Sequence, residues 1–425
     1  MRIKGLHIKF IWGLLFAVLL FNRAEAGPEA VTKVFSYFDE IMTLVCLCYL
    51  FLHCKTAGIK KNKQLISLWL LFILIGLLGT MIWRGQGIVP VLQDLLTTCS
   101  KFIIGYLAAY AYFLRTKKDG INGVICIAKA ITVLLFLSSL HDLFFSPWFQ
   151  TADFRYIMDS QQLLFAHPTY LTHAAATLLL LFAYEHLISG KYLKYMLMAS
   201  FLITIALRAK GIGFLGAFWF VYIFIFVMHT KRRGFIYFGA GVTALLFGFD
   251  LIETYFLDAT RFSPRKVLLL DSVKLMKMYF PIGTGFASFA SSVAASYYSP
   301  LYDQLGYGEY WGMAREENMF LSDSFWPCII GQFGFIGTIL FLTVLVVFAK
   351  KIIKIFRNDK KSGFIMLMIL GYMLISSMAE TSFFNPTSML LFMYFAYVEA
   401  RYDRSSQGKN QALVFSQKME TEQSS

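Results

Sequence analysis

Long uninterrupted apolar runs recur along almost the whole chain, and they limit its possible folds more than any other feature. Charged or turn-forming residues separate them into twelve candidate spans, 10–22, 31–53, 65–83, 92–114, 121–141, 168–188, 194–209, 211–229, 235–252, 325–349, 363–379 and 386–400. A helix of roughly 20 apolar residues crosses the hydrocarbon core of a bilayer. With 58% hydrophobic and 15% charged residues, the 425-residue chain is too apolar for a water-soluble globular protein. We therefore expect an all-α polytopic membrane protein with about twelve transmembrane helices.

The basic residues predict how this chain is oriented in the membrane. In a soluble protein, a formal net charge of +14 would suggest nucleic-acid binding. Here most lysines and arginines lie in every second connection between the apolar runs, beginning with the N-terminal segment. The positive-inside rule then places both termini in the cytoplasm. We expect no nucleic-acid partner.

The apolar pattern also divides the chain into four parts. These are spans one to nine (1–252), an outer-face loop (253–324), spans ten to twelve (325–400) and a polar cytoplasmic tail expected to be disordered (401–425). The first part begins with a basic segment, a short apolar run and Ala24-Glu25-Ala26, so residues 1–26 fit either a retained helix or a cleaved signal peptide. The topology of the remaining chain is the same in both cases.

The cysteines and histidines do not form a metal-binding pattern. The six cysteines lie in or beside apolar runs, as small buried hydrophobic residues do. Cys46 and Cys48 are separated by one residue, which is not the spacing of a zinc site, and no histidine stands beside them at ligand spacing. We expect neither a metal nor another cofactor.

The outer loop 253–324 contains a basic amphipathic helix. Ser263-Pro264 is a typical helix start, and the chain then continues without a breaker from Arg265 to Phe280. Arg261 and Arg265 flank the N-terminus of this helix, where backbone N–H groups and the helix dipole favour an anion. Two interpretations remain open: a helix lying in the headgroup layer, or a site for a pyrophosphate.

A second cationic pair lies at the predicted outer end of a span. Arg208 and Lys210 stand in the segment 207–214, LRAKGIGF, where Gly211 and Gly213 permit a tight turn. Basic residues on the outer side run against the positive-inside rule. They are either snorkelling residues at a hairpin tip or further ligands for the same anion.

Other parts of the outer loop have two interpretations each. The segment 280–286, FPIGTGF, suits a C-terminal turn or, more weakly, a phosphate-binding loop. Amphipathic aromatic rings then gather in residues 296–312 and suit either an interfacial belt or a glycan-binding platform. The candidate glycan-binding residues are Tyr297, Tyr298, Tyr302, Tyr310 and Trp311.

Two carboxylates at predicted outer ends of spans are candidate general bases. Asp323 precedes the tenth span, where it suits a base or a helix N-cap, and Glu380 ends the eleventh. The shorter outer loop 142–167 carries charges that we interpret as a solvated surface. Lys101 lies within a span and is expected to face the bundle interior or join the outer cations.

Three segments together resemble the O-antigen ligase and polymerase family, and specifically the Wzy-type polysaccharide polymerases. They are ITIALRAKGIGF (203–214), ATRFSPRKVLLLDSVKLMKMYFPIGTGF (259–286) and FLSDSFWPCIIGQFGFIG (320–337). The resemblance implies a GT-C-like bundle with a long outer loop between helices nine and ten. It also implies that Arg208 and Arg261 bind the pyrophosphate of a lipid carrier.

One departure from this family bears on the reaction. Ligases of the family carry a histidine just before the tenth span, whereas this chain has Asp323 there and no histidine from residue 230 onward. The departure favours a polymerase and leaves the identity of the base open between Asp323 and Glu380.

The resemblance implies a metal-independent glycosyltransferase at the outer face of the bacterial cytoplasmic membrane. Its donor would be an undecaprenyl-pyrophosphate-linked oligosaccharide, and its partners membrane lipid and a chain-length regulator or flippase of the same pathway. Arg208, Lys210, Arg261 and Arg265 would stabilise the leaving pyrophosphate. The alternatives are an O-antigen-type ligase, a lipid-linked oligosaccharide flippase, and a non-catalytic partner of an envelope assembly complex.

Overall fold

A computed structural model describes residues 2–25, 37–97, 100–116, 121–230 and 262–423, together with positions 234, 239 and 241. Nearly all the regular structure is helical. The first half comprises α1 (Arg2–Leu20), α3 (Phe38–Leu52), α4 (Ala57–Lys61), α5 (Lys63–Trp83), α6 (Ile88–Thr97), α7 (Lys101–Arg115), α8 (Ile121–Phe144), β1 (Thr151–Arg155), β2 (Met158–Gln161), α9 (Pro168–Ser189) and α10 (Leu193–Ile205). The second half comprises α11 (Ala209–Tyr222), the π-helix η1 (Ile223–Val227), α13 (Pro264–Met278), α14 (Ser292–Ser296), α15 (Pro300–Gln304), the 3₁₀ turns η3 (Tyr307–Glu309) and η4 (Ser382–Phe384), α16 (Phe325–Asn358), α17 (Lys360–Ser377) and α18 (Pro386–Gln423).

Several of the described helices have the length and composition of membrane spans. Among the described residues, five are long and apolar enough to cross a bilayer, and six if the bent pair α6 and α7 forms one span. Many exposed side chains on these helices are large and apolar, such as Leu70, Leu71 and Leu74 on α5, as lipid-facing surfaces require. The expected all-α membrane class is therefore confirmed. The predicted span 235–252 lies outside the described residues, apart from positions 239 and 241.

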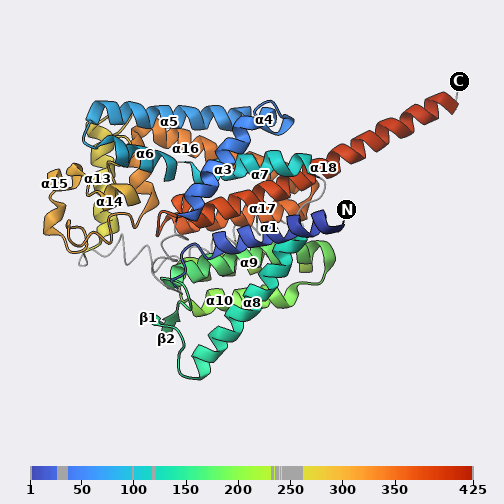
Figure 1. Ribbon diagram of the computed structural model, residues 1–425, viewed down its shortest axis with the longest axis horizontal. Helices are drawn as coiled ribbons and strands as arrows, with labels where there is room; N and C mark the ends of the chain where they lie inside the picture. The colour runs from blue at the N-terminus through green and yellow to red at the C-terminus, as the bar shows by residue number, and fades with distance from the viewer. Residues whose placement is uncertain are drawn as a thin grey trace.

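Most of the long helices run side by side along the long axis of the molecule (Figure 1). Helix α9 lies at the centre. In its most apolar stretch of 18 residues, 83% of the residues are buried, against 33% in the corresponding stretch of α5. Its ends follow local rules: Pro168 occupies the first turn, and Gly190 ends the helix in a left-handed conformation with φ 74°. A helix that is apolar on every side, as α9 is, belongs in the interior of a bundle.

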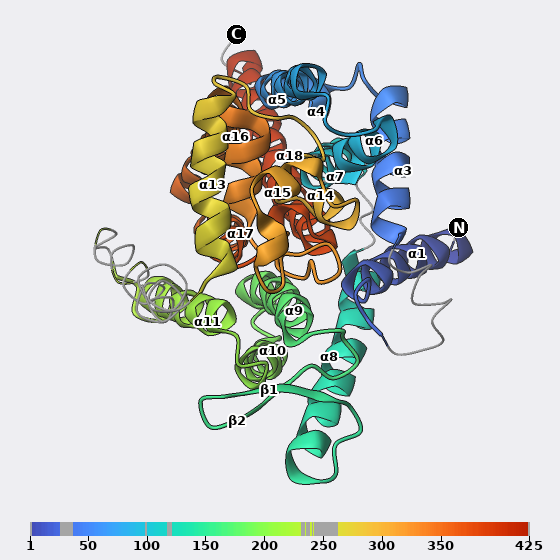
Figure 2. The ribbon, with the colours of Figure 1, turned by 90° about the vertical axis from the view of Figure 1, so that its left-hand side faces the viewer.

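Helix α13 has a different orientation from the bundle. It lies across one end of the long helices in both views (Figures 1 and 2) and packs against α16. Its buried face consists of Leu268, Ser272 and Leu275, which recur at helical spacing. The predicted helix is thus confirmed, although it ends at Met278 and not at Phe280.

The outer loop has a small core of its own after α13. Phe289, Tyr302 and Tyr307 are fully buried and their rings contact one another, while Phe286 is buried against Phe333 of α16. The segment FPIGTGF is held by backbone hydrogen bonds to α16: the N–H groups of Thr284 and Gly285 donate to the carbonyls of Gly331 and Gln332, at 3.2 and 2.7 Å. Its glycines therefore allow the backbone of this segment to approach the backbone of α16 closely.

Two features differ from the sequence expectations. Residues 142–167 include a short antiparallel hairpin, in which Phe154 pairs with Asp159. The tail was predicted to be disordered from Arg401, but α18 continues to Gln423 and extends beyond the body of the protein (Figure 1). The tail has no proline and contains four glutamines, two lysines, two glutamates and two arginines, which are good helix formers, so its polarity does not prevent a helix.

Candidate functional site

A polar cleft of about 540 Å³ opens at the end of the bundle where α13 lies. Its walls come from β1 and from the ends of α9, α11, α13, α16, α17 and α18. The residues that line it are Arg155, His167, Thr169, Tyr170, Arg208, Ala209, Lys210, Arg265, Met319, Phe320, Ser322, Asp323, Ala379, Glu380, Thr381 and Asn385. Segments more than 200 residues apart in the sequence therefore share one site.

Five helices begin at this cleft. Lining residues precede or open α9, α11, α13, α16 and α18. At α11, α13 and α16, the described N-cap side chains of Arg208, Ser263 and Ser324 make no capping hydrogen bond to the helix. The first-turn N–H groups and the positive ends of the helix dipoles therefore favour an anionic ligand at this position.

Three of the four predicted cationic residues meet in the cleft. Arg208 and Lys210 come from the start of α11, and Arg265 comes from the first turn of α13. Their side chains are only 7%, 6% and 13% exposed, respectively. The fourth, Arg261, lies outside the described residues. Burying a charged side chain to this extent costs free energy unless an ion-pair partner or a bound ligand compensates the charge.

Each of these three cations has a carboxylate partner. Nη2 of Arg208 lies 2.8 Å from Oδ1 of Asp153, and Nη2 of Arg265 lies 3.0 Å from Oδ2 of Asp323. Nζ of Lys210 lies 2.6 Å from Oε1 of Glu380. The cleft is therefore lined by ion pairs that a strongly charged anion can open by competing for the cations.

The local sequence explains how α11 brings its cations so close to α9. Leu207 has φ 49°, so the chain reverses before Arg208 and not at the glycines. A Cβ atom on Gly211 would lie 2.5 Å from Cγ2 of Thr172 in α9. The glycine thus permits helix contact, which is a correction to the tight turn that we predicted there.

The two predicted carboxylates have opposite electrostatic environments. Partial burial in the cleft wall raises the pKa of Asp323, whose side chain is still 38% exposed, and this effect exceeds the opposing charge of Arg265. Burial also raises the pKa of Glu380, but the charges of His173 and Lys210 outweigh it and lower the pKa to about 2. Asp323 can therefore accept a proton more readily than Glu380.

Glu380 belongs to a buried polar chain beneath the cleft. Its Oε1 lies 2.7 Å from Nε2 of His173, whose Nδ1 lies 2.5 Å from the hydroxyl of Tyr372. Because Lys210 contacts the same carboxylate oxygen, this chain fixes the position of the lysine at the cleft wall. The sequence did not identify His173 as part of the site.

The sequence also gave no indication that two other residues reach the cleft. Arg155 comes from the hairpin that we predicted to be solvated, and His167 caps α9. Burial, with the charges of Arg208 and Lys210, lowers the pKa of His167 to about 4, so its ring is neutral near pH 7. Its Nδ1 accepts a hydrogen bond from the N–H of Thr169, which leaves the ring hydrogen on Nε2. The only local signal was a predicted span beginning at residue 168, and it says nothing about which residues lie beside His167.

The aromatic residues of the outer loop fall into two groups. Tyr298 and Tyr302 are buried, and their hydroxyls are hydrogen-bonded to the backbone at Met313 and Ala290, so these two rings are not open to a glycan. Three rings remain exposed, those of Tyr297, Tyr310 and Trp311. The ring of Trp311 lies 5.2 Å from that of Phe320, which lines the cleft. Of the five residues that we predicted to bind a glycan, only Tyr297, Tyr310 and Trp311 are therefore accessible to one.

Lys101 does not join the cationic cleft. It forms a buried ion pair with Asp39, and its Nζ lies 3.1 Å from Oε1 of Glu40, both on α3. The residue therefore links α7 to α3 inside the bundle, as a lysine within a span must when it has no access to water.

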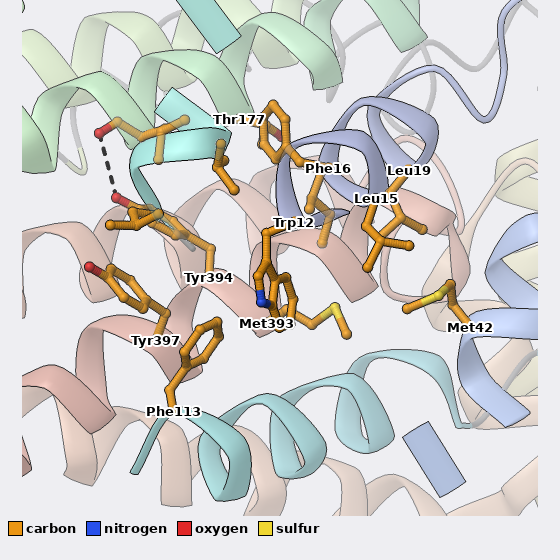
Figure 3. Close-up of a pocket in the computed structure, with 14 residues that line it drawn as sticks. Trp12, Leu15, Phe16, Leu19, Met42, Phe113, Thr177, Met393, Tyr394 and Tyr397 are labelled. Atoms are coloured by element: carbon orange, nitrogen blue, oxygen red, sulfur yellow. Dashed lines mark hydrogen bonds between the residues drawn. The ribbon is translucent and has the colours of Figure 1, made fainter. Parts of the chain in front are cut away.

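A second cavity lies among the helices, between α1, α7, α8, α9 and α18 (Figure 3). It has a volume of about 80 Å³ and is lined almost entirely by apolar groups, including Trp12, Phe16 and Met393. Tyr394 turns its hydroxyl away, toward the carbonyl of Leu181. This cavity suits hydrocarbon, because it offers too few polar groups to bind a sugar or a phosphate.

Comparisons with known proteins give no assignment for this chain. No protein-family model matches it, and no curated protein matches it. In the part of the chain that the structure describes, no group of three or more His, Cys, Asp or Glu residues could hold a metal ion. The function must therefore be argued from the cleft and from the sequence resemblance.

Proposed function

We propose that this protein polymerises lipid-linked oligosaccharide repeat units into a surface polysaccharide. The observation that carries the proposal is the cleft in which Arg208, Lys210 and Arg265 meet Asp323 at the start of several helices. Cations and helix N-termini suit a pyrophosphate, and a carboxylate with a raised pKa suits a general base. The three sequence segments that resemble Wzy-type polymerases supply these same residues.

In the proposed reaction, the donor is a glycan attached to undecaprenyl pyrophosphate. The pyrophosphate binds Arg208, Lys210 and Arg265, together with Arg261, and competes with Asp153 and Asp323 for the guanidinium groups. Fixed cations stabilise the negative charge that develops on the leaving group, so the protein needs no metal ion for this purpose.

The acceptor is a sugar hydroxyl of a second lipid-linked unit. Its oxygen forms the new bond to the anomeric carbon, while the bond from that carbon to the pyrophosphate oxygen breaks with its electron pair. Asp323 accepts the hydroxyl proton once the pyrophosphate has drawn Arg265 away. Glu380 holds Lys210 in place and is a positioning residue in this scheme. Tyr297, Tyr310 and Trp311 bind the glycan by their exposed faces.

The proposal includes the arrangement in the membrane. Twelve spans in a GT-C-like bundle, with both termini in the cytoplasm, place the cleft at the outer face of the bacterial cytoplasmic membrane. Substrate then reaches it after a flippase has transferred the lipid-linked unit, and a chain-length regulator is a natural partner.

The test is the size distribution of lipid-linked and surface glycan in a deletion strain. Wild-type protein should restore long chains, and Arg265→Ala should leave single repeat units at the outer face. Arg315→Ala is the matched control, because Arg315 is exposed and pairs with Asp303 away from the cleft. Arg265→Ala protein that is normally inserted and restores full-length chains would refute the proposal.

The same experiment separates the other functions. Long chains stranded on the lipid carrier would indicate a ligase, and repeat units trapped on the inner leaflet would indicate a flippase. An unchanged glycan in the deletion strain would refute the polymerase, and unaffected glycan length in an Arg208→Ala/Arg261→Ala variant would indicate a non-catalytic partner.

A further inference from the structure

A second charged pocket lies at the end of the bundle opposite the cleft. It has a volume of about 200 Å³ and is formed by the start of α5 and the C-terminal part of α16, near α4. Four of its eight lining residues are lysines, and the full lining is Lys61, Asn62, Gln64, Leu65, Val347, Lys350, Lys351 and Lys354. The cleft mechanism uses none of these residues.

The four lysines have different surroundings. Nζ of Lys61 lies 2.5 Å from Oδ2 of Asp403, and Nζ of Lys351 lies 2.8 Å from Oε1 of Glu399. Lys350 and Lys354 lie one turn apart on α16 and are exposed. Among the described residues, no carboxylate lies within ion-pair distance of either one. The pocket therefore has a net positive charge concentrated at these two lysines.

The surface of α16 next to these lysines is apolar. Ile339, Leu342 and Val346 are 44–49% exposed and precede Lys350 at helical spacing, so they form one stripe with the two lysines. Along this stripe, an apolar surface long enough to contact an acyl chain ends at two lysines that have no carboxylate partner in the part of the chain that the structure describes. A free phosphate would use only the charged end of this stripe.

We propose that this pocket binds the headgroup of an anionic phospholipid, with an acyl chain lying along Ile339, Leu342 and Val346. Basic pockets between transmembrane helices suit such headgroups, because the lysines compensate a net negative charge that zwitterionic lipids lack. The site is independent of the proposed polymerase reaction.

Titration of the purified full-length protein with phosphatidylglycerol, followed by native mass spectrometry, tests the proposal. The double variant Lys350→Gln/Lys354→Gln should bind phosphatidylglycerol more weakly, by roughly fivefold for each lysine removed. The matched control is Arg357→Gln/Lys360→Gln, which removes the same charge at the same end of the bundle but outside the pocket. Its affinity should stay within about twofold of wild type.

Three outcomes would overturn the proposal. Equal losses in the two double variants would show a diffuse charge effect. Equal affinity for phosphatidylcholine would show that the net headgroup charge is not recognised. Displacement of the lipid by millimolar inorganic phosphate would show a site for free phosphate.

Discussion

Asp323 and Glu380 face the same cleft, but their surroundings suit different tasks. Glu380 contacts Lys210 and His173, and the charges of these groups keep its pKa at about 2 despite burial. Asp323 has one guanidinium partner, and burial raises its pKa above the usual 3.8. A base must hold the proton that it removes, and a carboxylate with a pKa near 2 does this poorly. Residue identity alone could not separate the two, since both are carboxylates at a predicted span end.

Replacement of the proposed base should reduce turnover without preventing donor binding. We expect Asp323→Asn to lower the polymerisation rate by about 10²- to 10⁴-fold, measured with purified protein and lipid-linked repeat units. Because the base acts when deprotonated, the wild-type rate should fall as the pH drops through the raised pKa of Asp323, above the pH expected for an ordinary aspartate. Asp303→Asn, at an exposed site outside the cleft, should keep the wild-type rate. A wild-type rate in Asp323→Asn would exclude this residue as the base.

Helix α16 contains a break that joins the outer loop to the membrane helices. Gly334 has φ 60° and ψ −157°, and the N–H of Ile336 donates to the carbonyl of Pro281 from the loop. A Cβ atom on Gly334 would lie 2.4 Å from the backbone nitrogen of Gly283. The loop that follows α13 is therefore attached to α16 by backbone contacts that only glycine permits.

Substitution at this break should destabilise the protein. Gly334→Ala requires both a left-handed alanine and a shift of the Gly283 backbone, so we expect a loss of roughly 2 kcal/mol or more. The measurement is the melting temperature of the purified protein in detergent. Gly371→Ala provides the control, because a Cβ atom there meets nothing within 4 Å inside α17, and alanine favours a helix. Equal melting temperatures for the two variants would contradict this account of the break.

The whole molecule has two polar ends separated by apolar helices. The cleft lies beside the start of α16, and the lysine pocket lies about 25 residues later on the same helix. At 1.5 Å per residue, this separation is roughly 35–40 Å, slightly more than the hydrocarbon thickness of a bilayer. The two sites are therefore expected at opposite membrane surfaces.

Cysteine labelling can check this arrangement in intact cells. In a cysteine-free background, a cysteine at exposed Gly308 in the outer loop should react with a membrane-impermeant maleimide added from outside. A cysteine at exposed Arg357, beyond the lysine pocket, should react only after the membrane is permeabilised. Labelling of both positions from the same side would rule out the proposed orientation.

The sequence by itself determined the class of this protein and several local features. Hydropathy over a span length predicts membrane helices, and the start of α13 follows from Ser263-Pro264, because helix entry depends on neighbouring residues. The cationic residues of the cleft could also be proposed, since charges at a predicted outer end are costly without a partner.

Only the tertiary structure decided which of these groups meet. It brings the hairpin residue Arg155 and the helix cap His167 to the cleft, buries Tyr302, and pairs Lys101 with α3. It also sets the opposite pKa directions of Asp323 and Glu380. These outcomes depend on packing between segments far apart in the chain, and local sequence carries little information about such contacts. The sequence therefore indicated which types of residue form this site, and only the folded structure showed how those residues are arranged.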